Sequence, residues 1–344
     1  MLRQKIGQML MVGFEGSSLS DNDAIVSDIV NHSLGGVILF DYHFKLKKFD
    51  HNIKNPKQLA HLCAQLQGYA KDLPLFIGVD YEGGKVNRLK ETYGFPPTQT
   101  AAALGVGSLE QTKECAIQMA CALQRAGINL NFGPVLDLNV NPDNPIIGQL
   151  GRSFSSDVEK VVQYAGVFSE IYQEHGILFA YKHFPGHGSA TADTHAGFVD
   201  ISSSWIPSEL IPFTALLKKY DCPMVMVGHL VNRQLDPTAY PASLSSTMIT
   251  GLLRKELGYD GVVVTDDMQM KAITDCYGLE EALILAINAG NDLLIFGNQL
   301  AEGVPVKVII DMIESAVHTR KIPLSCIDSA YERIVKLKKK LIDT

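Results

Sequence analysis

Eight short apolar segments, separated by stretches of helical periodicity, constrain the fold more than any other feature. Each is an almost continuous apolar run, as expected for a strand buried on both faces of a parallel sheet. The predicted strands are Gln8–Phe14, Gly35–Phe40, Pro74–Asp80, Asn129–Asp137, Ile177–His183, Cys222–Gly228, Gly261–Asp266 and Asp292–Phe296. Eight β–α alternations in 344 residues predict a single-domain (β/α)₈ TIM barrel. A doubly wound open sheet is disfavoured because no glycine-rich phosphate turn follows the first strand.

The intervening helices carry recognisable start and stop signals. Asn55 before Pro56 predicts an N-cap, and Ser108 and Ser156 each precede a Gln or Glu by three residues, as in a capping box. Gly258 is a predicted helix stop. Residues 323–344 are expected to form a closing C-terminal helix with a basic, solvated outer face, and the barrel domain is expected to occupy 1–344.

Composition excludes several partner classes. A net charge of −7 disfavours nucleic acid, and no apolar run is long enough to span a bilayer, so neither nucleic acid nor membrane is an expected partner. The stretch Ile6–Phe14 is interpreted as a barrel strand, not as a signal peptide. Six cysteines without a CxxC spacing suggest free thiols in a reducing compartment. The expectation is a cytoplasmic protein, with a monomer as the default oligomeric state.

Polar residues gather where the predicted strands end. Five strands end in or just before polar residues: Asp80, Asp137, Lys182-His183, His229 and Asp266-Asp267. The carboxyl ends of the strands share one face of a barrel, where active sites form. The sequence therefore predicts an active site at this face.

Asp266 and Asp267 end the most apolar of these strands. A carboxylate at a barrel mouth can act as nucleophile, base or metal ligand, whereas the structural alternative is a cap on the next helix. Because adjacent strand residues point to opposite sides, we expect one aspartate to be catalytic and the other structural.

The loop from Lys182 to His195 has the highest density of reactive groups. It holds three histidines and Asp193 within a turn-rich segment. Asp193 can hydrogen-bond to His195, fix its tautomer and raise its pKa, which would produce an acid/base dyad. His183, His187 and His195 could instead bind a metal, although their spacing matches no familiar zinc signature. A purely structural role for the histidines is the third interpretation.

Three further residues could contact a ligand. Asp80 could accept hydrogen bonds from a sugar diol with Arg88 beside it, or the two could form an ion pair that stiffens their loop. Arg152 could meet a substrate oxygen or hold its own loop. Trp205 could stack on a sugar, but a lone tryptophan is more often a packing residue.

These motifs together resemble a known family. The chain is similar over nearly its whole length to the family 3 glycoside hydrolases, specifically the single-domain bacterial β-N-acetylhexosaminidases. The most specific segment is the KHFPGHG motif at 182–188 with Asp193-Thr194-His195. Other matching segments are Gly35–Phe40, Asp80–Arg88, Gly133–Asp137, Gly151–Phe154, Pro241–Ser245 and Thr265–Met268.

The resemblance implies a role for each matching position. Asp266 is implied as the nucleophile and His195 as the acid/base, held by Asp193. The residues implied to bind N-acetylglucosamine are Asp80, Arg88, Arg152, Lys182 and His183. No metal and no cofactor are implied. Residues 41–54 depart from the usual loop of the family, which bears on the leaving-group preference.

The implied activity is a retaining exo-β-N-acetylglucosaminidase of peptidoglycan recycling. Its expected substrate is a carbohydrate, N-acetylglucosamine linked to 1,6-anhydro-N-acetylmuramic acid in muropeptides. The alternatives are a family 3 glycosidase with another sugar preference, a phosphorylase activity, a sugar-binding protein without activity, and a metal-dependent barrel hydrolase.

Overall fold

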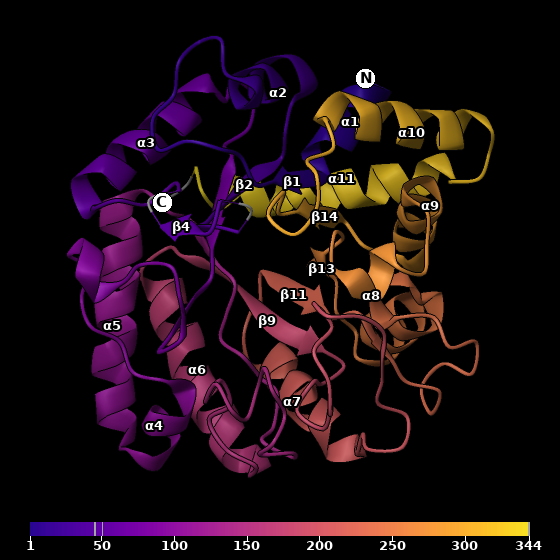
Figure 1. The fold of residues 1–344 in the computed structure, drawn as a ribbon. Coiled ribbons are helices and arrows are strands. Elements are labelled where there is room, and N and C mark those ends of the chain that lie inside the picture. The colour runs from indigo at the N-terminus through magenta and orange to yellow at the C-terminus, as the bar shows by residue number, and fades with distance from the viewer. Residues whose placement is uncertain (45, 50, 343–344) are drawn as a thin grey trace.

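The chain folds into a closed barrel of eight parallel strands surrounded by helices, as the computed structural model of residues 1–44, 46–49 and 51–342 shows (Figure 1). The predicted (β/α)₈ TIM barrel is confirmed, and every predicted strand overlaps a barrel strand. In chain order the barrel strands are β1 (Leu10–Val12), β2 (Gly36–Leu39), β5 (Phe76–Val79), β8 (Leu130–Asn131), β9 (Leu178–Phe184), β11 (Met224–Val227), β13 (Val262–Asp267) and β14 (Leu293–Phe296). Each strand pairs with its neighbours in sequence, and β14 pairs with β1 to close the barrel.

Helices follow the strands and cover the outside of the barrel. They are α1 (Leu2–Gln8), α2 (Ala24–His32), α3 (Pro56–Tyr69), α4 (Ala101–Val106), α5 (Leu109–Ala126), α6 (Val158–Glu174), α7 (Ile211–Lys219), a π-helix η4 (Thr247–Glu256), α8 (Lys271–Thr274), α9 (Leu279–Ala289), α10 (Val306–His318) and α11 (Leu324–Lys339). Short 3₁₀ segments are η1 (Glu91–Tyr93), η2 (Pro207–Leu210) and η3 (Ala242–Leu244).

Three small sheets lie in the loops outside the barrel. They pair β3 (Tyr42–His43) with β4 (Lys48–Phe49), β6 (Tyr81–Gly83) with β7 (Val86–Asn87), and β10 (Val199–Asp200) with β12 (Leu230–Val231). The first two pairs are antiparallel hairpins that follow β2 and β5 respectively. They therefore belong to the loops at the carboxyl ends of the strands.

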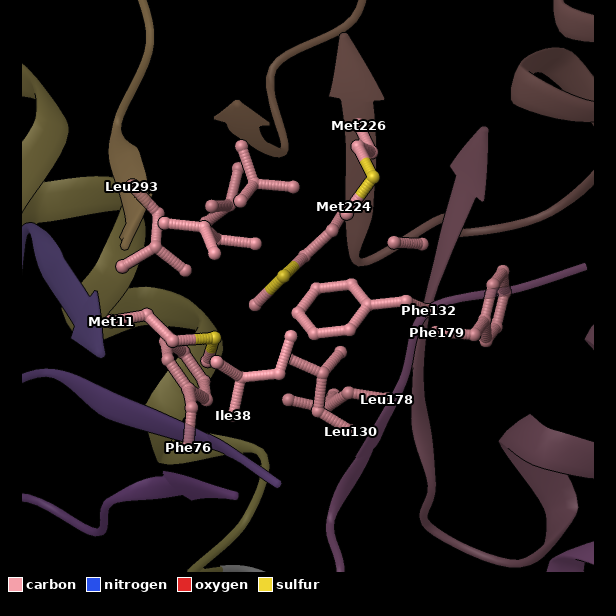
Figure 2. Close-up of a cluster of buried hydrophobic side chains, with 14 of the residues drawn as sticks. Met11, Ile38, Phe76, Leu130, Phe132, Leu178, Phe179, Met224, Met226 and Leu293 are labelled. Atoms are coloured by element: carbon pink, nitrogen blue, oxygen red, sulfur yellow. The ribbon is translucent and has the colours of Figure 1, made fainter. Parts of the chain in front are cut away.

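The barrel interior is filled with large apolar side chains. Figure 2 shows side chains from several strands converging there, among them Met11, Ile38, Phe132 and Met224. All four are at most 5% exposed. This packed interior is typical of a barrel with a solid core, so a ligand site must lie above it in the loops.

The helix start signals were mostly confirmed. Asn55 caps α3, and Ser108 forms the predicted capping box with Gln111 on α5. The capping box predicted at Ser156 is wrong. Asp157 caps α6 instead, and its side chain accepts from the backbone N–H groups of Glu159 and Lys160. Gly258 follows η4 with a positive φ of 72°, as a helix stop requires.

The first predicted strand needs correction. Leu2–Gln8 forms α1, so the barrel strand begins only at Leu10. Helix α1 packs against α10 and α11 at the end of the barrel where the strands begin (Figure 1). The sequence predicts one strand here because α1 is short and its buried residues, such as Ile6, are continuous with those of β1.

The predicted closing helix is α11, although residues 343 and 344 of that prediction lie outside the described residues. Its face is not uniformly solvated. The buried Lys338 ammonium donates to Gln8 Oε1 and to the Gly35 carbonyl oxygen, each at 2.7 Å. These contacts attach α11 to the starts of β1 and β2.

The other expectations from composition can be compared with the fold. All six cysteines are free thiols, as predicted. Within residues 1–44, 46–49 and 51–342, no helix has both the length and the apolar character needed to cross a bilayer. Trp205 is a packing residue, buried among Val199, Ile201 and Leu230 with its indole N–H donating to the Pro185 carbonyl oxygen.

Candidate active site

A cavity of about 370 Å³ opens at the carboxyl ends of the barrel strands. The eight residues to which the family resemblance gives a catalytic or binding role all line it: Asp80, Arg88, Arg152, Lys182, His183, Asp193, His195 and Asp266. These residues come from the ends of β5, β9 and β13 and from the loops that follow β5, β8 and β9. The fold therefore brings together side chains separated by up to about 180 positions in the sequence.

The two adjacent aspartates at the end of β13, Asp266 and Asp267, have different surroundings. Asp267 accepts hydrogen bonds from the backbone N–H groups of Gln269 and Gly297, so it holds the turn after β13. Burial raises the pKa of Asp266. The neighbouring imidazoles of His229, His183 and His195 have the larger, opposite effect, so the pKa lies below its usual value. Asp266 is thus an ionised carboxylate facing the cavity.

His229 supports the end of the same strand. Its Nε2–H donates to the Asp267 carbonyl oxygen at 2.9 Å, which leaves Nδ1 to accept from the Ser243 hydroxyl at 2.6 Å. Burial lowers the pKa of His229. A neutral imidazole in this tautomer fits both contacts and fixes the backbone beside Asp266.

Asp193 and His195 form the predicted hydrogen-bonded pair. Asp193 Oδ1 accepts from both the backbone N–H and the Nδ1–H of His195, each at 2.8 Å. Loss of water lowers the pKa of His195, but the hydrogen bond from Asp193 and the charge of Asp266 outweigh this effect and raise the pKa. The His195 side chain is 49% exposed, so Nε2 remains free to exchange a proton with a ligand.

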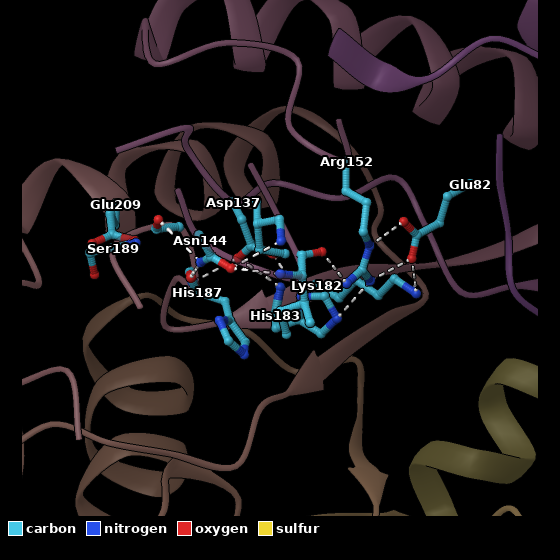
Figure 3. Close-up of polar contacts among 12 residues, drawn as sticks. Glu82, Asp137, Asn144, Arg152, Lys182, His183, His187, Ser189 and Glu209 are labelled. Carbon is cyan, nitrogen blue, oxygen red and sulfur yellow. Dashed lines mark hydrogen bonds and ion pairs between the residues drawn. The ribbon is translucent and has the colours of Figure 1, made fainter. Parts of the chain in front are cut away.

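A network of alternating charges includes three residues that line the cavity, Asp80, Lys182 and Arg152. Lys182 Nζ lies 2.8 Å from Asp80 Oδ1 and 2.6 Å from a Glu82 carboxylate oxygen. Glu82 also binds Arg152 through two contacts of 2.7 Å (Figure 3). Burial raises the pKa of Glu82, but the charges of Arg152 and Lys182 lower it to about 2. All four groups are therefore charged at neutral pH.

Arg88 extends this network at the cavity rim. It lies 3.6 Å from Asp80 and 4.0 Å from the buried Asp41, which also binds Lys90. The ion pair predicted as the structural alternative is therefore present, and both residues also line the cavity. Binding of a sugar by Asp80 stays a prediction. The same is true of Arg152, which holds its loop through the Ile146 carbonyl oxygen while lining the cavity.

His183 is held by the buried carboxylate of Asp137. Asp137 accepts from His183 Nδ1 at 2.7 Å and from the backbone N–H groups of His183 and His187. His183 Nε2 lies 3.3 Å from an Arg152 nitrogen, which can only donate. A neutral His183 with its proton on Nδ1 satisfies both neighbours, so Asp137 orients the imidazole and does not itself line the cavity.

His187 does not join the other histidines as a ligand cluster. Its ring lies beside that of His183 (Figure 3). The ring is buried, and burial lowers the pKa of His187 to about 4. Among the described residues, no group of three or more His, Cys, Asp or Glu side chains is arranged to hold a metal ion. The spacing of His183, His187 and His195 thus does not become a three-histidine site in the fold.

Hydrogen bonds and close packing from neighbouring segments hold the loop that carries these histidines. Asn144 donates to the carbonyl oxygens of His187 and Gly188, and Gly188 lies so close to the Leu138 carbonyl that a Cβ would sit 1.7 Å from it. Glu209 accepts from the Ser189 backbone N–H and packs beneath Gly186. Burial raises the pKa of Glu209 to about 7.

Sequence reasoning missed Glu82, Asn144 and Glu209. Glu82 had a usable signal, because it lies two residues after Asp80 in an extended segment and so points to the same side. Asn144 and Glu209 had none, because each contacts the histidine loop from far along the chain. Asn144 is 43 positions from His187, and Glu209 is 20 positions from Ser189.

The chain is similar to known proteins over most of its length. The profile of the Glycosyl hydrolase family 3 N terminal domain matches residues 1–337. The chain is 31% identical to "Beta-hexosaminidase A" of Pseudoalteromonas piscicida over 98% of this chain and 61% of that protein. It is 32% identical to "Beta-hexosaminidase LpqI" of Mycobacterium tuberculosis over 98% of this chain and 82% of that protein.

Solved structures give the same result. A family 3 beta-N-acetylglucosaminidase from Paenibacillus sp. str. FPU-7 superposes with a TM-score of 0.90 and 36% identity, over 100% of this chain and 63% of that one. A beta-N-acetylhexosaminidase from Beutenbergia cavernae has a TM-score of 0.87 and 28% identity, over 98% of each chain. The present chain thus spans less than two thirds of some relatives and nearly all of others. It belongs to glycosyl hydrolase family 3, a family of glycoside hydrolases.

Proposed function

We propose that the protein is a retaining exo-β-N-acetylglucosaminidase that removes terminal β-linked N-acetylglucosamine. The observation that carries the proposal is the meeting of an ionised carboxylate, Asp266, and a hydrogen-bonded Asp193–His195 pair in one cavity. A retaining glycosidase needs a nucleophile on one side of the scissile bond and a proton donor on the other. The names of the relatives support the sugar class.

In the first step Asp266 attacks the anomeric carbon, while the His195 imidazolium donates its Nε2 proton to the leaving oxygen. A covalent glycosyl–Asp266 ester and a neutral His195 result. In the second step His195 removes a proton from water, the water oxygen attacks the anomeric carbon, and Asp266 leaves as a carboxylate. The sugar keeps its β configuration because the carbon is inverted twice.

Asp193 serves both steps by holding His195. Its carboxylate stabilises the imidazolium of the first step and keeps the Nδ1 proton in place when His195 acts as a base. Five residues supply hydrogen-bond donors and acceptors for the sugar hydroxyls: Lys182, Asp80, Arg88, Arg152 and His183. Because they are bound to one another, their positions are set before substrate arrives, which lowers the entropic cost of binding.

A panel of p-nitrophenyl β-glycosides tests the sugar class. The N-acetylglucosaminide should be cleaved much faster than the glucoside or the N-acetylgalactosaminide, and NMR should detect the β-anomer of N-acetylglucosamine first. Release of the α-anomer first would contradict the covalent mechanism. Activity that is lost with a chelator and restored by zinc would favour a metal-dependent hydrolase.

The finer substrate proposal is N-acetylglucosamine linked to 1,6-anhydro-N-acetylmuramic acid, in cytoplasmic recycling of muropeptides. It is supported by the family resemblance. Comparing purified muropeptides with chitobiose as substrates tests it. Incubation in high phosphate, with detection of sugar 1-phosphate, tests whether phosphate can replace water in the second step.

A further inference from the structure

Two large apolar side chains stand partly exposed at the entrance of the cavity. Phe44, on the β3–β4 hairpin after β2, is 45% exposed, and Leu300, in the loop after β14, is 39% exposed. Both line the same cavity as Asp266 and His195. Apolar surface left in water is unfavourable, so a ligand that covers these side chains gains binding free energy.

Hydrogen bonds join the two segments that carry Phe44 and Leu300. The Phe44 backbone N–H donates to Gln299 Oε1 at 3.4 Å, and the Gln299 amide nitrogen lies 3.0 Å from His51 Nε2. The ring of Tyr42 meets that of Phe44 edge-on, with the ring centroids 5.2 Å apart. The hairpin after β2 is thereby attached to the loop after β14, which carries Leu300.

A second apolar wall faces the first across the barrel. Ile146 and Leu150 line the cavity from the loop after β8. In the barrel order, β8 and β14 are four strands apart, so the loops that follow them stand on opposite sides. The charged side chains of Lys182 and Arg152 in this cavity are buried, whereas Phe44 and Leu300 are its large apolar side chains that are more than a third exposed.

This division by polarity indicates what each part of the cavity binds. Charged donors and acceptors suit the hydroxyl-rich terminal sugar. Phe44 and Leu300 suit a group that presents a flat apolar face, and the C–H face of a pyranose ring is such a group. An aromatic ring favours such a contact because its face is electron-rich and its area is large.

We propose that Phe44 and Leu300 form the binding surface for the leaving group and select a second sugar ring that presents its apolar face. The inference rests on the proposed function, since it concerns the group that the same reaction releases.

The test compares two substrates that share the terminal sugar. In N,N′-diacetylchitobiose the leaving group is a sugar ring, whereas in β-N-acetylglucosaminyl fluoride it is a single atom that reaches neither Phe44 nor Leu300. Phe44→Ala should lower kcat/KM for the disaccharide, relative to the fluoride, by about tenfold. Leu300→Ala should act in the same direction, and Phe44→Tyr, which keeps the ring, should restore the wild-type ratio.

Leu46→Ala is the matched control, because Leu46 is a 59% exposed apolar residue of the same hairpin that does not line the cavity. It should leave the ratio unchanged. Equal losses on both substrates in Phe44→Ala, or an unchanged ratio, would overturn the inference alone. A wild-type protein that cleaves neither substrate would overturn the proposed function and this inference with it.

Discussion

The backbone N–H of Ala272 donates a hydrogen bond to the carbonyl oxygen of Thr194 across 3.2 Å. Thr194 is the buried residue between Asp193 and His195, and Ala272 lies in the short helix α8 that follows the β13 turn. One main-chain contact therefore joins the loop of the proposed acid/base to the segment of the proposed nucleophile. The separation of the two catalytic groups depends on this contact as well as on the barrel itself.

Asp266→Asn should reduce turnover of p-nitrophenyl β-N-acetylglucosaminide by about 10³-fold or more, because the amide cannot form the glycosyl ester. Steady-state kinetics with circular dichroism will separate loss of chemistry from loss of fold. Asp275→Asn makes the same chemical change at an exposed position outside the cavity and should be fully active. Near-wild-type activity in Asp266→Asn would show that the nucleophile is another group.

His195→Ala should slow the disaccharide by about 10²–10⁴-fold but an activated aryl glycoside much less. The reason is that only a poor leaving group needs protonation as the bond breaks. Measuring both substrates under single-turnover conditions checks this difference. If the two rates fall by the same factor, His195 does not act as the general acid.

Asp193→Asn should move the alkaline limb of the kcat/KM profile to lower pH. His195 must be protonated in the free enzyme, so activity falls as pH rises through its pKa. The hydrogen bond and charge of Asp193 raise that pKa, and their loss lowers it. An alkaline limb that stays in place in a folded variant contradicts the assignment.

Glu82→Gln should lower the free energy of unfolding by about 3–5 kcal/mol, because it leaves Arg152 and Lys182 with uncompensated buried charge. Chemical denaturation gives the value. Glu280→Gln is the control, since Glu280 pairs with Lys321 where both side chains are more than half exposed. That change should cost less than about 1 kcal/mol. Similar losses in the two variants would mean that the cavity network contributes no more than a surface pair.

Glu209→Gln should flatten the dependence of stability on pH. Glu209 has a pKa of about 7 in the folded protein, above its ordinary value of 4.5. Its stabilising contribution is therefore complete below about pH 4.5 and is lost as pH rises toward 7, by up to about 3 kcal/mol. Denaturation at pH 4.5 and pH 8 should show a smaller difference in the variant than in the wild type, and an equal difference would exclude Glu209 as the source.

The barrel and most of the site could be predicted from sequence because both follow local rules. Buried parallel strands are continuous apolar runs, and their polar end residues share one face, so Asp80, Lys182 and Asp266 were found together. The supports of the site follow no local rule. Asp137, which ended a predicted strand, proved to orient His183, and Glu209 reaches the histidine loop only after the chain has closed around the barrel.

Helix boundaries failed where two signals competed. At Ser156 the capping-box pattern is present, but Asp157 offers a stronger acceptor one residue later. At the N-terminus the apolar residues of α1 and β1 form one run, and periodicity over so few residues cannot separate a helix from a strand. The outer face of α11 was predicted to be basic and solvated, but the fold buries one of its lysines, Lys338.

That lysine separates two kinds of change in the molecule. Lys338 binds the starts of β1 and β2, whereas the cavity is built on the ends of the strands. Substitutions around the ammonium group are expected to change the stability of the barrel, because neither of its contacts, Gln8 and Gly35, lines the cavity. A variant weakened by an altered entrance loop could therefore be stabilised from the opposite end of the barrel, without reversing the change in leaving-group preference.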